Sequence, residues 1–204
     1  MTFRAVFHSV YYFFGLLLNR GCRCWWNLRD FWVPPRENAV LFVAHPDDDT
    51  LFFHTFIKKY HPYVVLLTTG WSWRRFFCFC KVMKLYGVRY RAYDLLSRDT
   101  RTEKLSKHIK EANSKGNFII CATHNAEGEY GHEMHKRVHE AVISQIKCPI
   151  YVPISEEKLI DHPLSTACYQ EKKSIFEKYY KTELFVLEQY RSWVEHEQLV
   201  QHNC

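Results

Sequence analysis

Residues 39–50 read Ala-Val-Leu-Phe-Val-Ala-His-Pro-Asp-Asp-Asp-Thr, and this stretch decides the fold. Its apolar first half carries no charge, which is typical of a short strand buried in a sheet. Pro46 fixes its own φ and biases the preceding histidine away from helix, so the chain should turn where the apolar run ends. Apolar residues then recur at helical spacing, and we expect that helix to be capped by Asp48, Asp49 or Thr50. A strand, an acidic turn and a helix in this order place polar side chains at the carboxyl edge of a parallel sheet.

Strands and helices alternate along the chain after this unit. Apolar, partly β-branched runs predict further strands at 63–68, 88–95, 118–122 and 150–154. Helical spacing of apolar residues predicts helices at 51–60, 74–86, 102–113, 131–146, 163–180 and 182–200. This alternation predicts an α/β fold, a Rossmann-like, doubly wound, mostly parallel sheet of about five strands flanked by helices. Residues 36–204 suffice for one such domain with a full core.

The composition is that of a globular protein, with 47% hydrophobic and 17% aromatic residues among 204. The net charge of +6 allows an anionic partner, but the basic residues are scattered rather than gathered in a stripe, so we expect no nucleic-acid partner. The eight cysteines include no C-x-x-C pair of the zinc-finger kind. We therefore expect a reduced, cytoplasmic setting.

The first 35 residues form a separate aromatic and basic segment. Its uninterrupted apolar run, Val10–Leu18, is shorter than the roughly 20 residues needed to span a bilayer, and no small-x-small cleavage site follows. Two interpretations stay open. The segment is an extra helix packed on the domain, or residues 1–33 form an interfacial anchor of tryptophans and arginines that associates peripherally with a membrane.

Two polar clusters follow the ends of two predicted strands. The first is the His-Pro-Asp-Asp-Asp sequence at 45–49, and the second, at 124–135, reads His-Asn-Ala-Glu-Gly-Glu-Tyr-Gly-His-Glu-Met-His. Open α/β sheets bind their ligands at the carboxyl ends of strands. His132 and His135 are three residues apart, so on a helix they share a face and can reach one centre.

Imidazole and carboxylate groups are the ligands of catalytic zinc sites, in which three protein ligands leave one position open for water. Two histidines and one aspartate would leave another carboxylate free to take a proton from that water. Helix capping explains one or two of the adjacent aspartates, and a single histidine in a loop is more often solvated than a ligand. Neither explanation accounts for both clusters at strand ends of one sheet, so the residues themselves indicate a metal site.

The two clusters resemble the two motifs of the PIG-L/LmbE family of zinc-dependent de-N-acetylases. Val-Ala-His-Pro-Asp-Asp at 43–48, followed by Asp-Thr-Leu-Phe, is similar to the family's opening motif. Thr-His-Asn at 123–125, leading to Gly-Glu-Tyr-Gly-His-x-x-His at 128–135, is similar to its second motif. With shorter matches between them, the similarity covers about 38–154. The family's fold is a Rossmann-like sheet, which agrees with the fold predicted from the strand and helix pattern.

The resemblance implies one divalent metal ion, zinc, as cofactor. His45, Asp48 and His135 match the positions of the family's three metal ligands. Asp47 matches the general base that activates the water on the metal.

The resemblance also implies how a substrate is held. His132 matches the histidine that stabilises the oxyanion and helps to protonate the leaving amine, and Tyr130 matches a tyrosine near the substrate carbonyl. Arg75 and Asn125 fall where the family contacts its substrate. The implied reaction removes the N-acetyl group from an N-acetylglucosamine unit of a glycolipid, a glycoconjugate or a sugar nucleotide, so the expected partner is an N-acetylated sugar.

Three positions depart from the family pattern. Asp49 and Cys78 stand where glutamates are usual, and Met134 stands where an aspartate or asparagine is common. None of the three is an inferred ligand or the inferred base, so we expect a working metal site. Two other functions stay open: a metal-dependent phosphoesterase, because His and Asp clusters also serve phosphate chemistry, and a non-catalytic carbohydrate- or lipid-binding member of the fold.

Overall fold

The computed structural model describes residues 38–69, 72–93 and 102–202. The segment at 1–35, together with its predicted role as a packed helix or membrane anchor, lies outside these residues, as do the last positions of the strand predicted at 88–95. No helix in the described ranges combines the length and the apolar character needed to cross a bilayer.

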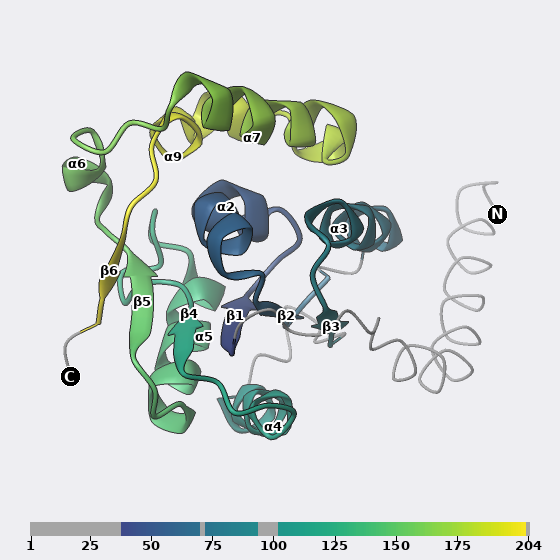
Figure 1. Ribbon diagram of the computed structural model, residues 1–204, viewed down its shortest axis with the longest axis vertical. Helices are drawn as coiled ribbons and strands as arrows, with labels where there is room; N and C mark the ends of the chain where they lie inside the picture. Colours follow the sequence, from purple (N-terminus) through teal and green to yellow (C-terminus); the bar gives the residue numbers. More distant parts are fainter. Residues whose placement is uncertain (1–37, 70–71, 94–101, 203–204) are drawn as a thin grey trace, which may run out of the picture. The chain divides into compact units, whose positions relative to one another are not determined.

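One sheet forms the centre of the described domain (Figure 1). Within the described residues it has six strands in the order β3-β2-β1-β4-β5-β6, and the first five of these run parallel. Their bounds are β1 (Ala39–Val43), β2 (Tyr63–Leu66), β3 (Tyr90–Ala92), β4 (Ile120–Ala122), β5 (Ile150–Pro153) and β6 (Leu199–Gln201). The predicted α/β, mostly parallel architecture is confirmed.

Helices cover both faces of this sheet (Figure 1). One face carries α2 (Asp48–Tyr60) and α3 (Trp73–Tyr86), and α7 (Thr166–Lys178) and α9 (Arg191–Glu195) pack on the outer side of α2. The other face carries α4 (Thr102–Asn113) and α5 (Glu133–Gln145). Shorter turns complete the C-terminal part: α6 (Glu156–Leu159), η1 (Lys181–Glu183) and α8 (Val186–Gln189).

The core follows from the alternation of side chains along β1, because successive residues of a strand point to opposite faces of a sheet. Val40 and Phe42 join a buried cluster with Val138 and Val142 of α5. Every residue of β1 is buried, as expected for a central strand covered on both sides. This central position fixes where the polar residues after β1 emerge.

The prediction of one helix over 182–200 is wrong. The chain there forms η1, α8, α9 and the strand β6, which pairs antiparallel with β5. Without β6, the outer edge of β5 would leave a row of backbone groups unpaired, and an added edge strand satisfies them. The helix predicted at 163–180 is shorter, because α7 begins after Ser165, whose side chain accepts a hydrogen bond from Cys168 N–H.

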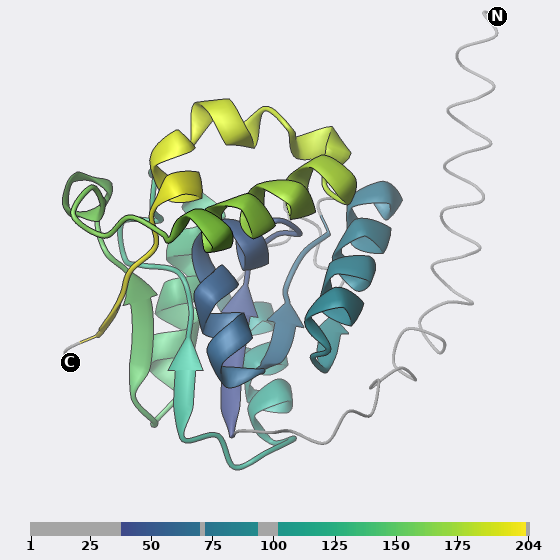
Figure 2. The ribbon, with the colours of Figure 1, turned by 45° about the horizontal axis from the view of Figure 1, so that its top comes forward.

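The strand order explains why the two polar clusters meet. β1 and β4 are neighbours, but the chain leaves β1 toward β2 on one side and leaves β4 toward β5 on the other. The arrows of these parallel strands point to the same edge of the sheet (Figure 2). A crevice at such a change of direction is where open α/β sheets bind ligands, and both clusters follow strands at this point.

Candidate metal centre

The turn after β1 sets the orientation of the three aspartates. The N-cap of α2 is Asp47 rather than Asp48, Asp49 or Thr50, because the Asp47 carbonyl accepts the first helical hydrogen bond, from Leu51 N–H at 2.8 Å. The Asp47 side chain makes no capping bond, and its backbone has φ 101 and ψ −31, which is unusual for a residue other than glycine. Asp48 lies in the first helical turn and accepts His45 N–H at 2.7 Å.

Three atoms of the two clusters that could bind a metal ion lie at nearly equal distances from one another. His45 Nδ1 lies 3.4 Å from Asp48 Oδ2 and 3.3 Å from His135 Nε2, and His135 Nε2 lies 3.4 Å from Asp48 Oδ2. Ligands about 2.05 Å from a tetrahedral zinc ion are about 3.35 Å apart. The spacing of these atoms therefore equals one face of a tetrahedral coordination shell.

His124 and His132 also lie close to these atoms. Asp48, His124 and His135 form a buried group that could hold a metal ion, and His45, His132 and His135 form a second such group. Four histidines and one aspartate thus converge, more than a single ion with an open position requires. The hydrogen bonds that two of these rings accept from backbone amides indicate which histidines are free to bind a cation.

His124 and His132 each use the lone pair of one ring nitrogen to accept a backbone N–H. Ala44 N–H donates to His124 Nε2 at 3.0 Å, which places the proton of that ring on Nδ1, facing Glu129. Met134 N–H donates to His132 Nδ1 at 3.2 Å, so the proton of His132 is on Nε2. The lone pair of His124 Nε2 is therefore already used, and the protonated Nε2 of His132 has none to give. These hydrogen bonds favour His45 and His135 over His124 and His132 as the histidines that would bind a cation together with Asp48.

Glu129 fixes the orientation of both buried histidines. Its Oε2 accepts His135 Nδ1–H at 2.6 Å and His124 Nδ1–H at 3.1 Å. A carboxylate behind a ligating histidine sets its tautomer and directs the other nitrogen at the metal. Glu129 has φ 57, and reciprocal hydrogen bonds with Asn125 hold it there: Asn125 N–H donates to Glu129 Oε1 at 2.9 Å, and Glu129 N–H donates to Asn125 Oδ1 at 2.8 Å.

We expect Glu129→Gln to weaken metal affinity about 10- to 100-fold, the usual cost of removing such a supporting carboxylate. If the glutamine oxygen accepts the two histidine N–H groups, its NH2 group faces the donor Asn125 N–H, and if the amide is turned round, the histidines face a donor. In either orientation a hydrogen bond is lost, and His135 loses a favourable charge. Competition with a chromophoric chelator measures the affinity. Glu127→Gln, an exposed residue of the same loop, is the matched control and should bind as the wild type. Equal affinities for both variants would contradict the role of Glu129.

The charges at the centre leave a place for a cation. Burial disfavours charge on His135, but Asp48 and Glu129 outweigh this effect and raise its pKa to about 10. Burial lowers the pKa of His45, so that ring is neutral near pH 7. Burial alone would raise the pKa of Asp48, yet the charge on His135 holds it well below its usual value. Without a metal ion, protonated His135 offsets part of the negative charge of the two carboxylates, and a divalent ion would replace its proton.

Metal binding is therefore expected to release about one proton per ion at pH 8, because only His135 must lose one. Its pKa of about 10 lies above that pH, so affinity should rise with pH, about tenfold per unit between pH 7 and 9. Calorimetric titrations in two buffers with different ionisation enthalpies give the number of protons released. Binding without proton release would contradict a protonated His135 that gives up its proton to become a ligand.

The remaining predicted residues lie around this centre. Arg75 Nη2 donates to Asp47 Oδ1 at 2.7 Å and to the Pro46 carbonyl at 2.9 Å, so its guanidinium holds the turn. Asn125 is buried, and its Nδ2 donates to the Pro153 carbonyl at 3.2 Å. Contact of Arg75 or Asn125 with a substrate stays a prediction. Within the protein, Arg75 stabilises the turn after β1, and Asn125 stabilises the loop that carries Glu129.

The rings of Tyr130 and His132 both lie against the ring of His135. Both are partly exposed, and the Tyr130 ring lies edge-on to His132 with the ring centroids 5.8 Å apart. Burial, followed by the charges of His135 and His45, lowers the pKa of His132 to about 4, so the ring is neutral. Burial raises the pKa of Tyr130, which keeps its hydroxyl protonated. His132 is the N-cap of α5 and not a helical residue as predicted, yet its ring still stacks on His135.

The sequence alone did not assign roles to His124 and Glu129. Both stand inside the second cluster, but a loop sequence does not reveal which of Glu127 and Glu129 turns inward. Asn125 four residues before Glu129 was the available signal, because that spacing allows the reciprocal hydrogen bonds that hold Glu129 in place.

Comparison with protein-family profiles and with curated proteins finds no match to this sequence. Fold and site together define an α/β protein with a buried His/Asp cluster that could hold a metal ion.

Proposed function

We propose that this protein is a zinc-dependent amide hydrolase that removes the acetyl group from an N-acetylated sugar. The observation that carries the proposal is the equal spacing of His45 Nδ1, Asp48 Oδ2 and His135 Nε2, at 3.3 to 3.4 Å, with Asp47 next to Asp48 in the chain. Two imidazoles and one carboxylate in tetrahedral spacing are a donor set suited to zinc with one open position.

The bound ion would supply Lewis acidity, polarising the acyl oxygen of the substrate and making a water molecule at the site more acidic. Asp47 would accept the proton of that water. Burial raises the pKa of Asp47 well above its usual value, while Arg75 opposes this shift. A base is more effective when its pKa approaches the working pH. Arg75 occupies Oδ1, and no hydrogen bond within the described residues occupies Oδ2, which leaves that oxygen for the water.

His132 and Tyr130 would stabilise the negative charge that develops on the acyl oxygen. Both are protonated on the atom that can donate, Nε2 of His132 and the hydroxyl of Tyr130. Donors fixed in place before the reaction stabilise such charge most effectively. When the carbon–nitrogen bond breaks, the proton taken from water passes to the amine with the help of His132, and acetate and a free amine leave.

The choice of an N-acetylglucosamine unit rests on the resemblance to the PIG-L/LmbE motifs. A screen of N-acetylated sugars, sugar nucleotides and glycolipids, read by acetate release from zinc-loaded protein, tests it. We expect acetate release that stops when the metal is removed by a chelator and returns when zinc is added. Metal-dependent release of phosphate from phosphate esters would instead identify a phosphoesterase. Sugar binding without turnover would identify a non-catalytic binding protein.

A further inference from the structure

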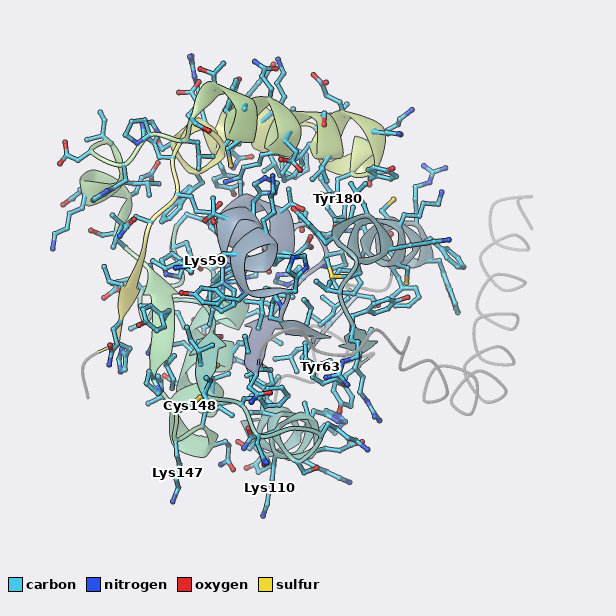
Figure 3. All side chains as sticks on the ribbon, in the orientation of Figure 1. Lys59, Tyr63, Lys110, Lys147, Cys148 and Tyr180 are labelled. Carbon is cyan, nitrogen blue, oxygen red and sulfur yellow. The ribbon has the colours of Figure 1, made fainter. Side chains whose placement is uncertain are left out.

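Two residues from far along the chain reach the turn that carries Asp47. Tyr180 and Glu183 belong to a single turn, in which Glu183 N–H donates to the Tyr180 carbonyl at 2.8 Å. Residues three apart in such a tight turn lie on the same face. Figure 3 labels Tyr180 on the side of the sheet that carries α2, α3 and α7. Both residues lie beyond 38–154, the part of the chain that resembles the PIG-L/LmbE family.

Tyr180 acts on the backbone of the turn through Asp49. Its hydroxyl donates to Asp49 Oδ1 at 2.8 Å, and the same oxygen accepts Asp47 N–H at 3.1 Å. Tyr180 and Asp49 are both fully buried, so water cannot replace either bond. The phenol therefore fixes the carboxylate that holds the Asp47 amide.

Glu183 acts on the side chain of Asp47 through Arg75. Glu183 Oε1 lies 3.1 Å from Arg75 Nε, while Arg75 Nη2 donates to Asp47 Oδ1 at 2.7 Å. Glu183 is buried, with 7% of its surface exposed, and removing one partner of a buried ion pair leaves the other charge without compensation. Asp47 is thus held at its amide by Asp49 and Tyr180, and at its carboxylate by Arg75 and Glu183.

Such double support has a physical reason. Asp47 has φ 101, a conformation that persists in a residue with a side chain only where its surroundings over-determine it. If either support is lost, the turn can relax toward negative φ, which would swing the carboxylate away from the metal centre. We propose that Tyr180 and Glu183 are positioning residues for Asp47. This proposal rests on the proposed function, in which Asp47 is the base.

The test uses Tyr180→Phe and Glu183→Gln in the full chain with zinc bound. Each should lower kcat about 10- to 100-fold, because misplacing a catalytic group by an ångström has effects of this size. KM and the zinc content should stay unchanged. Val194→Ala, a buried residue of α9 without polar contact to the turn, controls for loss of stability and should keep the wild-type kcat.

Combining each substitution with Asp47→Asn separates positioning from a general structural effect. If Tyr180 and Glu183 act through Asp47, adding either change to Asp47→Asn should cause no further loss of kcat. Losses that multiply, or an unchanged kcat in both single variants, would overturn the proposal.

Crystal structures provide a readout that does not depend on activity. Asp47 should have positive φ in the wild type and negative φ in Tyr180→Phe. If the wild type releases no acetate, the proposed function is refuted, but the structural support of Asp47 by Tyr180 and Glu183 is not. If φ of Asp47 is unchanged in both variants, the positioning role is refuted, but the proposed function is not.

Discussion

Asp47→Asn is expected to lower kcat for deacetylation by about 10²- to 10⁴-fold, the usual contribution of a general base. Asparagine has nearly the same shape, its Oδ1 can still accept the hydrogen bond from Arg75, and it tolerates positive φ better than most residues. The geometry of the turn should therefore survive while the ability to take a proton is lost. Steady-state kinetics with elemental analysis of the same samples would show low turnover at full zinc content.

Asp161→Asn is the matched control, because it makes the same chemical change at an exposed aspartate away from the centre. That variant should keep wild-type kinetics. Wild-type turnover in Asp47→Asn would refute the assignment of the base. A loss of zinc from Asp47→Asn would show that Asp47 is a ligand instead.

His135→Ala is expected to weaken zinc affinity by on the order of 10³-fold, because it removes one of three ligands and binding needs all of them deprotonated and in place. The wild type should retain one ion per chain after dialysis, and the variant should lose it. His135 is fully buried, so His135→Gln, which fills more of the space, checks that metal loss does not come from unfolding.

His139→Ala is the control for this experiment. His139 is also a buried histidine of α5, but its Nδ1 donates to the His124 carbonyl at 2.8 Å and it belongs to neither metal-compatible group. It should lose stability and keep zinc. Zinc retained by His135→Ala and lost by His139→Ala would reverse the assignment of the ligand.

The fold was largely predictable because its signals are local. The uncharged run before His45 marks β1, and the alternation of strands and helices that follows is enough to predict a parallel sheet. The C-terminal part was not predictable in this way. β6 is defined by its pairing with β5, about 50 residues earlier in the chain, and Leu199–Gln201 carry no pattern that distinguishes an edge strand from a helix end.

The residues of the centre were predictable, but several of their roles were not. The clusters that contain His45 and His135 follow the ends of two strands, which predicted that the two residues would converge, and the neighbouring β1 and β4 bring the clusters together. The tautomers of His124 and His132 depend on backbone amides that only the folded chain presents. The contact of Tyr180 with Asp49, 131 residues away, could not be predicted from either motif, because Tyr180 belongs to neither.

Anomalous diffraction at the zinc edge, from crystals grown with zinc, tests the central claim most directly. We predict one strong peak, about 2.0–2.2 Å from each of His45 Nδ1, Asp48 Oδ2 and His135 Nε2, with Asp47, His124 and His132 outside the coordination shell. A peak coordinated by His124 or His132 in place of His45, or no peak between these three atoms, would contradict it.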